Sequence, residues 1–253
     1  MESQSPTIRK IESLEEVEIR SLPSVAYYVA DFLTPEEEVT LLRKIATAPK
    51  PRWTQLKNRR LQVWPSDLAK GNTLLDAPLP QWLIDPIISR LRSLPISKAD
   101  NSRNIFTDSP HQTPNHVLIN EYLPGQGIMP HKDGPAYYPV VCTVSLSATL
   151  CLDLYGSKED GATEEKPRWR ILQEPRSLLI TSGELYVNYL HGIAEIKQDV
   201  DLGPTTVANW DLLGSPSAVI DGHNERQTRI SLTYRDVLKV ANLNAKLGIF
   251  GKR

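Results

Sequence analysis

The 253-residue chain is predicted to be an α+β protein, with helices in its N-terminal half and a barrel or two-sheet jelly roll in its C-terminal half. Helix-like patterns precede residue 100, whereas short segments rich in β-branched residues follow one another from about residue 115. Turns with glycine and proline separate these segments, as is typical of such β-folds. No internal repeat is visible, so we expect one domain over residues 25–240, between a loosely held arm over residues 1–24 and a tail over residues 241–253.

The first predicted elements are a strand and a helix in "SVAYYVADFLTPEEEVTLLRKIATAP", residues 24–49. Thr34 is a good N-cap, Pro35 suits the first helical position, and Glu37 completes a capping box. The buried face of this helix is expected to hold four aliphatic residues: Val39, Leu41, Leu42 and Ile45.

A second helix is predicted within "LPQWLIDPIISRLRSL", residues 79–94. Pro86 lies inside this pattern and leaves the start of the helix open, because proline disrupts a helix interior. Its apolar side is expected to hold Ile87, Ile88 and Leu91.

The second half of the chain contains the predicted β-core, at about residues 115–238. "NHVLINEYL" alternates like a half-buried strand, and "RQTRISLTYRDVL" closes the set with a strong alternation. The strands between them are expected in "VVCTVSLSATLCLDLYG", "WRILQE" and "RSLLITSGELYVNYLHGI". Three polar segments are expected to be loops: residues 124–139, 156–168 and 197–225.

Charge and cysteine content restrict the classes of function. The net charge of −1 argues against a broad basic field, so any contact with nucleic acid is expected to be local. Cys142 and Cys151 lie in apolar runs without metal-site or disulfide spacing, which indicates buried free thiols in a reducing compartment, the cytoplasm or the nucleus. No run of 18 apolar residues and no secretory signal is present, so no membrane association is expected.

The densest basic stretch is "PRWTQLKNRRLQVWP", residues 51–65. Arginines interleaved with tryptophans are the residues that stack on bases and pair with phosphates. A solvated amphipathic hairpin is the alternative interpretation. The candidate substrate-contacting residues in this stretch are Arg59, Arg60, Gln62 and Trp64.

A candidate metal site begins in "MPHKDG", residues 129–134. His131 and Asp133 are two residues apart, so on an extended segment both side chains point the same way. A third ligand, His191 in "YLHGI", is expected to come from the opposing sheet. Two imidazoles and one carboxylate on one face are typical of non-haem Fe(II) oxygenases. A polar turn is the alternative, and His111, His116 and His223 are other possible partners.

The strand "RISLTYR" suggests a site for the cosubstrate that such oxygenases use, 2-oxoglutarate. Arg229 and Arg235 are six residues apart and share one face with Ser231 and Thr233. Arginine matches a carboxylate in bidentate geometry, so this face suits a dicarboxylate pocket. The solvent side of an edge strand would give the same pattern. Two further hydrogen-bonding residues lie in "NEY": Asn120 and Tyr122.

In order and spacing, the motifs "NEY", "HKD", "LHGI" and "RISLTYR" resemble the AlkB family of Fe(II)- and 2-oxoglutarate-dependent dioxygenases. The resemblance covers about residues 25–238, and residues 56–65 and 122–141 are most similar to the eukaryotic branch known as AlkB homologue six. It implies a double-stranded β-helix (jelly roll) with a nucleotide-recognition lid at about residues 51–65. It also implies a monomer that uses Fe(II), 2-oxoglutarate and O2 to demethylate N-methylated bases in RNA or DNA oxidatively.

The resemblance assigns roles to individual residues. His131, Asp133 and His191 match the iron ligands. The residues that match 2-oxoglutarate contacts are Asn120, Tyr122, Arg229, Ser231 and Arg235, with Arg229 on the distal carboxylate. Ser231 stands where the family commonly has asparagine, which puts efficient turnover in doubt. Because a base inside a duplex cannot reach a buried metal, the target must be flipped out or single-stranded, and Tyr137 or Tyr138 is a candidate to stack on it.

Two other functions stay open at the level of sequence. The first is a reader, a protein that binds modified nucleic acid with little turnover. The second is an enzyme that uses the same iron chemistry to hydroxylate or demethylate protein side chains. The weak basic character of the chain is compatible with both alternatives.

Overall fold

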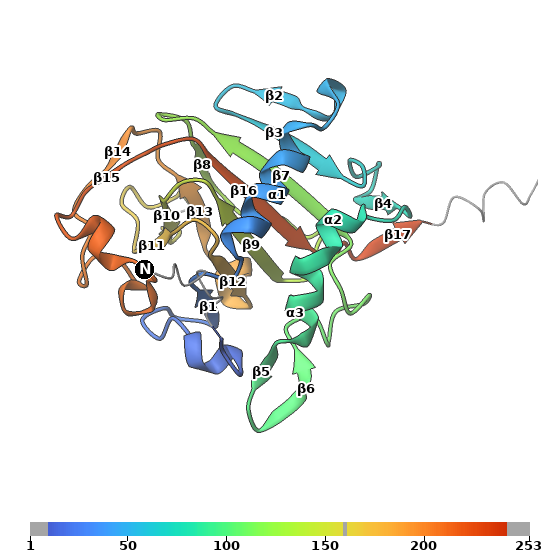
Figure 1. Cartoon of the computed structure of the whole chain (residues 1–253), viewed down its shortest axis with the longest axis horizontal. Helices are drawn as coiled ribbons and strands as arrows, with labels where there is room; N and C mark the ends of the chain where they lie inside the picture. Colours follow the sequence, from blue (N-terminus) through green and yellow to red (C-terminus); the bar gives the residue numbers. More distant parts are fainter. Residues whose placement is uncertain (1–9, 159–160, 242–253) are drawn as a thin grey trace, which may run out of the picture.

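Two antiparallel sheets form the centre of the computed structural model, which describes residues 10–158 and 161–241 (Figure 1). The order in the large sheet is β1-β12-β9-β16-β7-β3-β2, and in the small sheet β11-β10-β13-β8. The large sheet consists of β1 (Ala26–Val29), β2 (Thr54–Leu56), β3 (Arg59–Trp64), β7 (His116–Tyr122), β9 (Val140–Leu146), β12 (Leu178–Ser182) and β16 (Arg229–Arg235). The small sheet consists of β8 (Ile128–His131), β10 (Leu150–Tyr155), β11 (Trp169–Gln173) and β13 (Leu190–Ile193). The predicted α+β jelly roll is confirmed.

Smaller elements surround these sheets. Short strand pairs are formed by β4 (Thr73–Leu75) with β17 (Lys239–Ala241), β5 (Pro95–Ser97) with β6 (Asp100–Asn104), and β14 (Gln198–Asp199) with β15 (Asn224–Glu225). The short helical turns are η1 (Leu14–Val17), η2 (Lys50–Arg52), α4 (Glu184–Val187), η4 (Trp210–Leu212) and η5 (Pro216–Val219). In the described part of the chain, no helix is long and apolar enough to cross a membrane.

The predicted terminal segments are only partly described. Residues 1–9 of the arm and 242–253 of the tail lie outside the described residues. The rest of the arm is not loosely held, because Leu14 and Val17 of η1 are buried in the main hydrophobic core. The expectation of a loose arm over all of residues 1–24 was therefore wrong for residues 13–17.

Helix α1 (Pro35–Ala46) begins with the predicted capping box. The Thr34 hydroxyl accepts from the Glu37 backbone nitrogen at 3.1 Å, and the Glu37 carboxylate accepts from the Thr34 backbone nitrogen at 2.9 Å. Leu41 and Ile45 are buried and Leu42 is half-buried, but Val39 is 64% exposed. Its inclusion in the buried face was wrong, because a residue two positions before Leu41 lies about 200° around the helix.

The second predicted helix is broken into α2 (Gln81–Leu83), η3 (Ile84–Ile88) and α3 (Ser89–Ser93). Asp85 leaves helical geometry, with φ −104° and ψ 133°, because the residue before a proline is pushed towards extended backbone. Its predicted apolar side is nevertheless confirmed, since Ile87, Ile88 and Leu91 are all buried. Together with α1, these helices pack on the outer face of the large sheet (Figure 1).

The central strand β16 separates the apolar core from a cavity between the sheets. Ile230, Leu232 and Tyr234 belong to the core beneath the helices. The alternate residues of β16 line the cavity: Arg229, Ser231, Thr233 and Arg235. Because β16 lies between β7 and β9 and all its residues are buried, the solvent-exposed edge strand is excluded as an explanation of this pattern.

We predict that Thr34→Ala destabilises the protein by about 1 kcal/mol, because the substitution removes the side-chain acceptor of the α1 cap. Val39→Ala, on the exposed side of the same helix, should change stability by less than about 0.5 kcal/mol. Urea unfolding of the two variants measures both effects. Equal destabilisation by the two substitutions would contradict this description of α1.

Candidate active site

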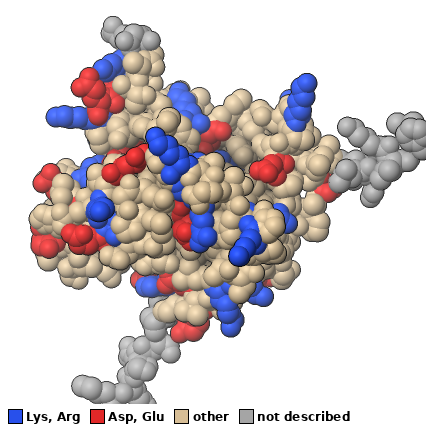
Figure 2. Space-filling model, turned by 90° about the horizontal axis from the view of Figure 1, so that it is seen from above, with Lys and Arg blue, Asp and Glu red and all other residues tan. Residues whose placement is uncertain are grey.

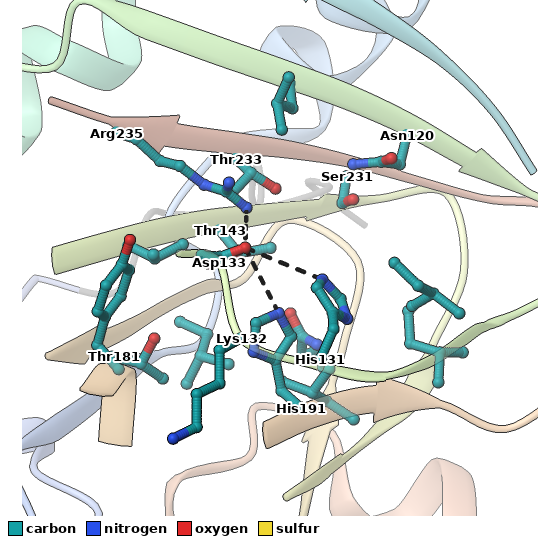
Figure 3. A pocket seen from close by; sticks show the side chains of 18 of the residues that line it. Asn120, His131, Lys132, Asp133, Thr143, Thr181, His191, Ser231, Thr233 and Arg235 are labelled. Carbon is teal, nitrogen blue, oxygen red and sulfur yellow. Dashed lines mark ion pairs between the residues drawn. The ribbon is translucent and has the colours of Figure 1, made fainter. Parts of the chain in front are cut away.

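A cavity of about 300 Å³ lies between the two sheets and collects most of the predicted site residues. The predicted residues that line it are Arg59, Asn120, Tyr122, His131, Asp133, Tyr137, His191, Arg229, Ser231 and Arg235. They come from β3, β7, β8, β13 and β16 and from the loop after β8, so both sheets contribute (Figure 3).

The three predicted metal ligands meet at one point in this cavity. The Oδ1 atom of Asp133 lies 3.9 Å from the Nε2 atom of His131 and 3.9 Å from that of His191. One ligand atom from each of the three residues lies within 4.8 Å of the others, and the two rings are 4.4 Å apart at their centroids (Figure 3). Among the described residues, no other histidine belongs to such a group.

His131 and His191 face each other across neighbouring strands of the same sheet. Strand β8 pairs antiparallel with β13, and His131 is the register partner of His191. The expectation that His191 comes from the opposing sheet was wrong. Between the two residues the chain passes through the large sheet twice, in β9 and β12, and each time returns to the small one.

The close pairing of β8 and β13 depends on two glycines and a bulge. A Cβ atom on Gly192 would lie 3.0 Å from the Pro130 nitrogen, and one on Gly127 would lie 2.1 Å from the Ile193 carbonyl oxygen. The register shifts by one residue between His191 and Ile193. Bulges of this kind redirect side chains, and here Ile128 and His131 both line the cavity although three positions separate them.

Both imidazoles can offer an unprotonated ring nitrogen to a metal ion. The Nδ1 atom of His131 lies 3.0 Å from the Met129 carbonyl oxygen, which can only accept. In the neutral ring Nδ1 is therefore the nitrogen that carries the proton, and Nε2 has its lone pair towards Asp133. Burial lowers the pKa of His191 to about 4 despite the opposing charge of Asp133, so this ring is neutral near pH 7. Two neutral imidazoles and one carboxylate fit Fe(II).

Arg229 supplies a buried positive charge at one end of the cavity. It is 2% exposed and donates to the Ser145 hydroxyl at 2.8 Å and the Gln173 amide oxygen at 3.0 Å. Both partners are neutral, Nε has no hydrogen-bond partner, and no ion pair joins Arg229 to an acid within residues 10–158 and 161–241. Burial lowers the pKa of Arg229 to about 10, so it remains cationic near pH 7. Because an unpaired buried charge is costly, this end of the cavity fits an anionic ligand such as a carboxylate of 2-oxoglutarate.

Further polar side chains lie beside Arg229 on strands β7, β9 and β16. Ser231 pairs in register with Ser145 of β9 and with Asn120 of β7, and Tyr122 is the partner of Arg229. The Asn120 side-chain oxygen accepts from Arg59 Nε at 3.2 Å. These groups place hydrogen-bonding atoms beside the Arg229 guanidinium, as a bound dicarboxylate requires.

Arg235, at the other end of β16, is already paired. One of its terminal nitrogens lies 2.8 Å from Asp133 Oδ1, the oxygen that faces the two imidazoles (Figure 3). Its guanidinium lies 4.9 Å from the centroid of the Tyr137 ring. Tyr137 therefore packs on Arg235 inside the cavity, whereas Tyr138 packs against the main core and does not line the cavity.

Only one of the four candidates on the predicted lid reaches the cavity. Strands β2 and β3 form a hairpin that joins the edge of the large sheet at β7. Arg59 lines the cavity, but Arg60 faces the other way and forms a bidentate ion pair with Glu121, at 2.6 and 2.7 Å. Neighbouring residues of a strand point to opposite faces, so the two arginines cannot both contact a ligand in the cavity.

Gln62 and Trp64 share the face of Arg60 and have structural partners there. Gln62 is fully buried, donates to the Ile45 carbonyl oxygen at 3.1 Å and accepts from Trp64 Nε1 at 2.9 Å. Trp64 also packs beneath the Arg52 guanidinium at 4.0 Å. Arg60, Gln62, Trp64 and Tyr138 therefore do not line the cavity, and their contact with a substrate stays a prediction.

The structure adds cavity residues that the sequence did not single out. The polar ones are Lys132, Thr143, Gln173, Thr181 and Tyr186, and Ser145 contacts Arg229 beside the cavity. Thr143 and Ser145 alternate with apolar residues in β9, and this pattern was the available signal. Gln173 carries no such signal, because only the approach of β11 makes it a partner of Arg229.

Comparisons with known proteins agree with this geometry. The family model described as "2OG-Fe(II) oxygenase superfamily" matches residues 25–235. The Danio rerio protein described as "Probable RNA/DNA demethylase ALKBH6" is 36% identical over 246 residues, which cover 95% of this chain and 97% of that protein. The Xenopus tropicalis protein "tRNA (carboxymethyluridine(34)-5-O)-methyltransferase alkbh8" is 30% identical over 234 residues, 88% of this chain and 33% of that protein.

The solved structure described as "The structure of OsALKBH1" has the same fold. It superposes with a TM-score of 0.51 at 15% sequence identity and covers 83% of this chain and 96% of that one. At this identity the match supports the jelly roll and its layout rather than a particular substrate.

We predict that His191→Ala lowers the affinity for Fe(II) by more than about 100-fold. Loss of an outer partner of a ligand alone costs about 10- to 100-fold, and this substitution removes a ligand atom itself. His223→Ala, which removes an exposed histidine outside the group, should leave the affinity unchanged. Anaerobic titration of the purified variants measures both, and similar affinities for the two would refute the site.

Proposed function

Because the chain belongs to the 2OG-Fe(II) oxygenase superfamily and to its AlkB family, we propose that this 2-oxoglutarate-dependent dioxygenase demethylates N-methylated bases in RNA or DNA. The description of the Danio rerio relative as a probable RNA/DNA demethylase supports this choice of substrate. Cytoplasmic or nuclear location and a monomeric state stay predictions.

One observation carries the proposal. A His131–Asp133–His191 group and the unpaired Arg229 guanidinium open into the same cavity. The first suits Fe(II), and the second suits the far carboxylate of a 2-oxoglutarate molecule bound to it. Bound Fe(II) would activate O2, the oxidant of the reaction, and 2-oxoglutarate would supply two electrons: it would lose CO2 and take up one oxygen atom to become succinate, while the other oxygen atom enters the methyl C–H bond.

The residues of the chain position and shield this chemistry. Met129 fixes the His131 ring, and Arg235 fixes the Asp133 carboxylate, so the three ligand atoms converge before a metal binds. Leu152, Leu154, Leu179 and Ile193 line the cavity and reduce access of water. Hydroxylation of an N-methyl group gives a hemiaminal, which releases formaldehyde and leaves the demethylated base.

A local contact with nucleic acid is more consistent with the surface than a broad one. Basic and acidic side chains are interspersed on the face shown in Figure 2. Besides Arg229 and Arg235, the basic residues that line the cavity are Arg59 on the lid hairpin and Lys132, whose amino end points away from the metal ligands (Figure 3). Such an arrangement suits a single extruded nucleotide with its flanking phosphates.

Turnover of methylated oligonucleotides tests the proposal. The protein with Fe(II), 2-oxoglutarate and O2 should form succinate and formaldehyde in equal amounts with N-methylated single-stranded RNA or DNA, and no formaldehyde with the unmethylated strand. Tight binding of the methylated strand without either product would favour a reader. Product with methylated or unmodified peptides alone would favour a protein substrate.

We predict that Arg229→Ala raises the KM for 2-oxoglutarate by roughly 30-fold or more, since loss of a buried charge partner costs about 2 kcal/mol or more. Arg176→Ala is a matched control, because Arg176 pairs with Asp31 on another part of the surface and does not line the cavity. Succinate formation at varied 2-oxoglutarate concentrations distinguishes the variants. An unchanged KM in Arg229→Ala would place the cosubstrate elsewhere.

We predict that Arg59→Ala weakens binding of a methylated oligonucleotide and lowers the salt dependence of its affinity by about one unit of slope. Arg60→Ala should leave that slope unchanged, because Arg60 faces the opposite side of β3 and is paired with Glu121. Fluorescence anisotropy at several salt concentrations measures both slopes. A larger effect of Arg60→Ala would reverse the assignment of the two faces.

A further inference from the structure

A buried histidine outside the metal group connects to that group through two other side chains. His116 is 2% exposed, and its Nδ1 atom lies 3.5 Å from the hydroxyl of Tyr137. The Tyr137 ring lies beneath the guanidinium of Arg235, at 4.9 Å. Arg235 in turn pairs with Asp133 at 2.8 Å. The four side chains form a continuous series from the interior of β7 to the metal-facing carboxylate.

The Ser66 carbonyl oxygen determines which atoms donate and which accept in this series. The Nε2 atom of His116 lies 3.0 Å from the Ser66 carbonyl oxygen, which can only accept, so Nε2 carries the proton. In a neutral ring Nδ1 is then an acceptor, and the Tyr137 hydroxyl donates to it. Burial lowers the pKa of His116, which keeps the ring neutral.

The far end of the series is held by the lid hairpin. Ser66 lies two residues beyond the end of β3, and Arg52 donates to the carbonyl oxygens of Val63 and Pro65, at 3.3 and 2.9 Å. His116 is also the register partner of Arg235 across β7 and β16, so its backbone position is fixed by the sheet. The Tyr137 ring is therefore held between a fixed imidazole and the arginine.

Arg235 needs such support because its side chain is long and flexible. Holding an arginine side chain in one conformation costs rotamer entropy. Its Nε atom has no hydrogen-bond partner, so the Asp133 carboxylate and the Tyr137 ring are the contacts that orient the guanidinium. An aromatic ring beneath a guanidinium attracts its positive charge and so favours this orientation.

We propose that His116 and Tyr137 are positioning residues, which hold the Arg235 guanidinium against Asp133 and thereby fix the carboxylate that faces the two imidazoles. This inference rests on the metal site of the proposed function and is independent of the nucleic-acid substrate. It assigns a purpose to a buried histidine that is not a ligand, and it links the base of the lid to the metal site.

Affinity for Co(II), measured by calorimetry on the full-length protein without nucleic acid, tests this role. His116→Phe and Tyr137→Leu should each weaken Co(II) binding about tenfold, as loss of outer partners of metal ligands does. His116→Gln should restore binding to within about threefold, because its amide both donates and accepts like the imidazole. Tyr189→Leu is the control, since Tyr189 packs on Trp169 and does not line the cavity.

A double-mutant cycle separates positioning from general support of the fold. If Tyr137 acts through Arg235, Tyr137→Leu should cost about tenfold in the wild type and less than twofold in an Arg235→Gln background. This comparison stands even if His116→Phe fails to fold. Equal losses in both backgrounds, or Co(II) affinities within twofold of the wild type in folded His116→Phe and Tyr137→Leu, would overturn the proposal.

Because no nucleic acid is present in these titrations, the outcome does not depend on the substrate. A protein that demethylates no oligonucleotide can still show the predicted cycle. Conversely, if the protein demethylates oligonucleotides but the effects of the Tyr137 and Arg235 substitutions simply add, the proposed function stands and only the positioning role is refuted.

Discussion

The pairing of β8 with β13 is the constraint on which the site depends. It sets His131 opposite His191, and it is possible because Gly127 and Gly192 lack the Cβ atoms that would collide with the neighbouring backbone. Asp133 follows two residues after His131, where the chain leaves the strand and turns into the cavity. A shift of β13 by one residue would turn His191 to the other face of the sheet.

The strand β16 distributes charge over the same cavity. Its two arginines share one face, but their surroundings differ: Arg229 has only neutral partners, and Arg235 is paired with the Asp133 carboxylate. The first is therefore free to pair with an anion that enters, whereas the second stabilises a carboxylate that belongs to the chain. This difference explains how one strand can serve both the cosubstrate and the metal site.

The periodicity of the sequence was sufficient to predict much of this arrangement. The alternation in β16 follows from strand geometry alone, and the α1 cap follows from local chemistry. The two-residue spacing of His131 and Asp133 correctly predicted that both belong to one metal group, although Asp133 lies just beyond the end of β8. The sheet in which a distant residue lies was harder to predict from the sequence. The return of His191 to the same sheet depends on how often the chain changes sheets, which no local pattern reports.

The lid is a second case in which the sequence pattern was not sufficient to place side chains. Arg59, Arg60, Gln62 and Trp64 were grouped by composition, yet β3 alternates and only Arg59 lines the cavity. Strand periodicity separates these residues into two faces, but only the pairing of β3 with β7 determines which face is turned inward.

A crystal structure of the protein with Mn(II) and an unreactive 2-oxoglutarate analogue tests the central claim most directly. The account predicts one metal ion bonded to His131, Asp133 and His191, and the far carboxylate of the analogue on the Arg229 guanidinium. A metal ion bound without His191, or an analogue whose carboxylate lies away from Arg229, would contradict it.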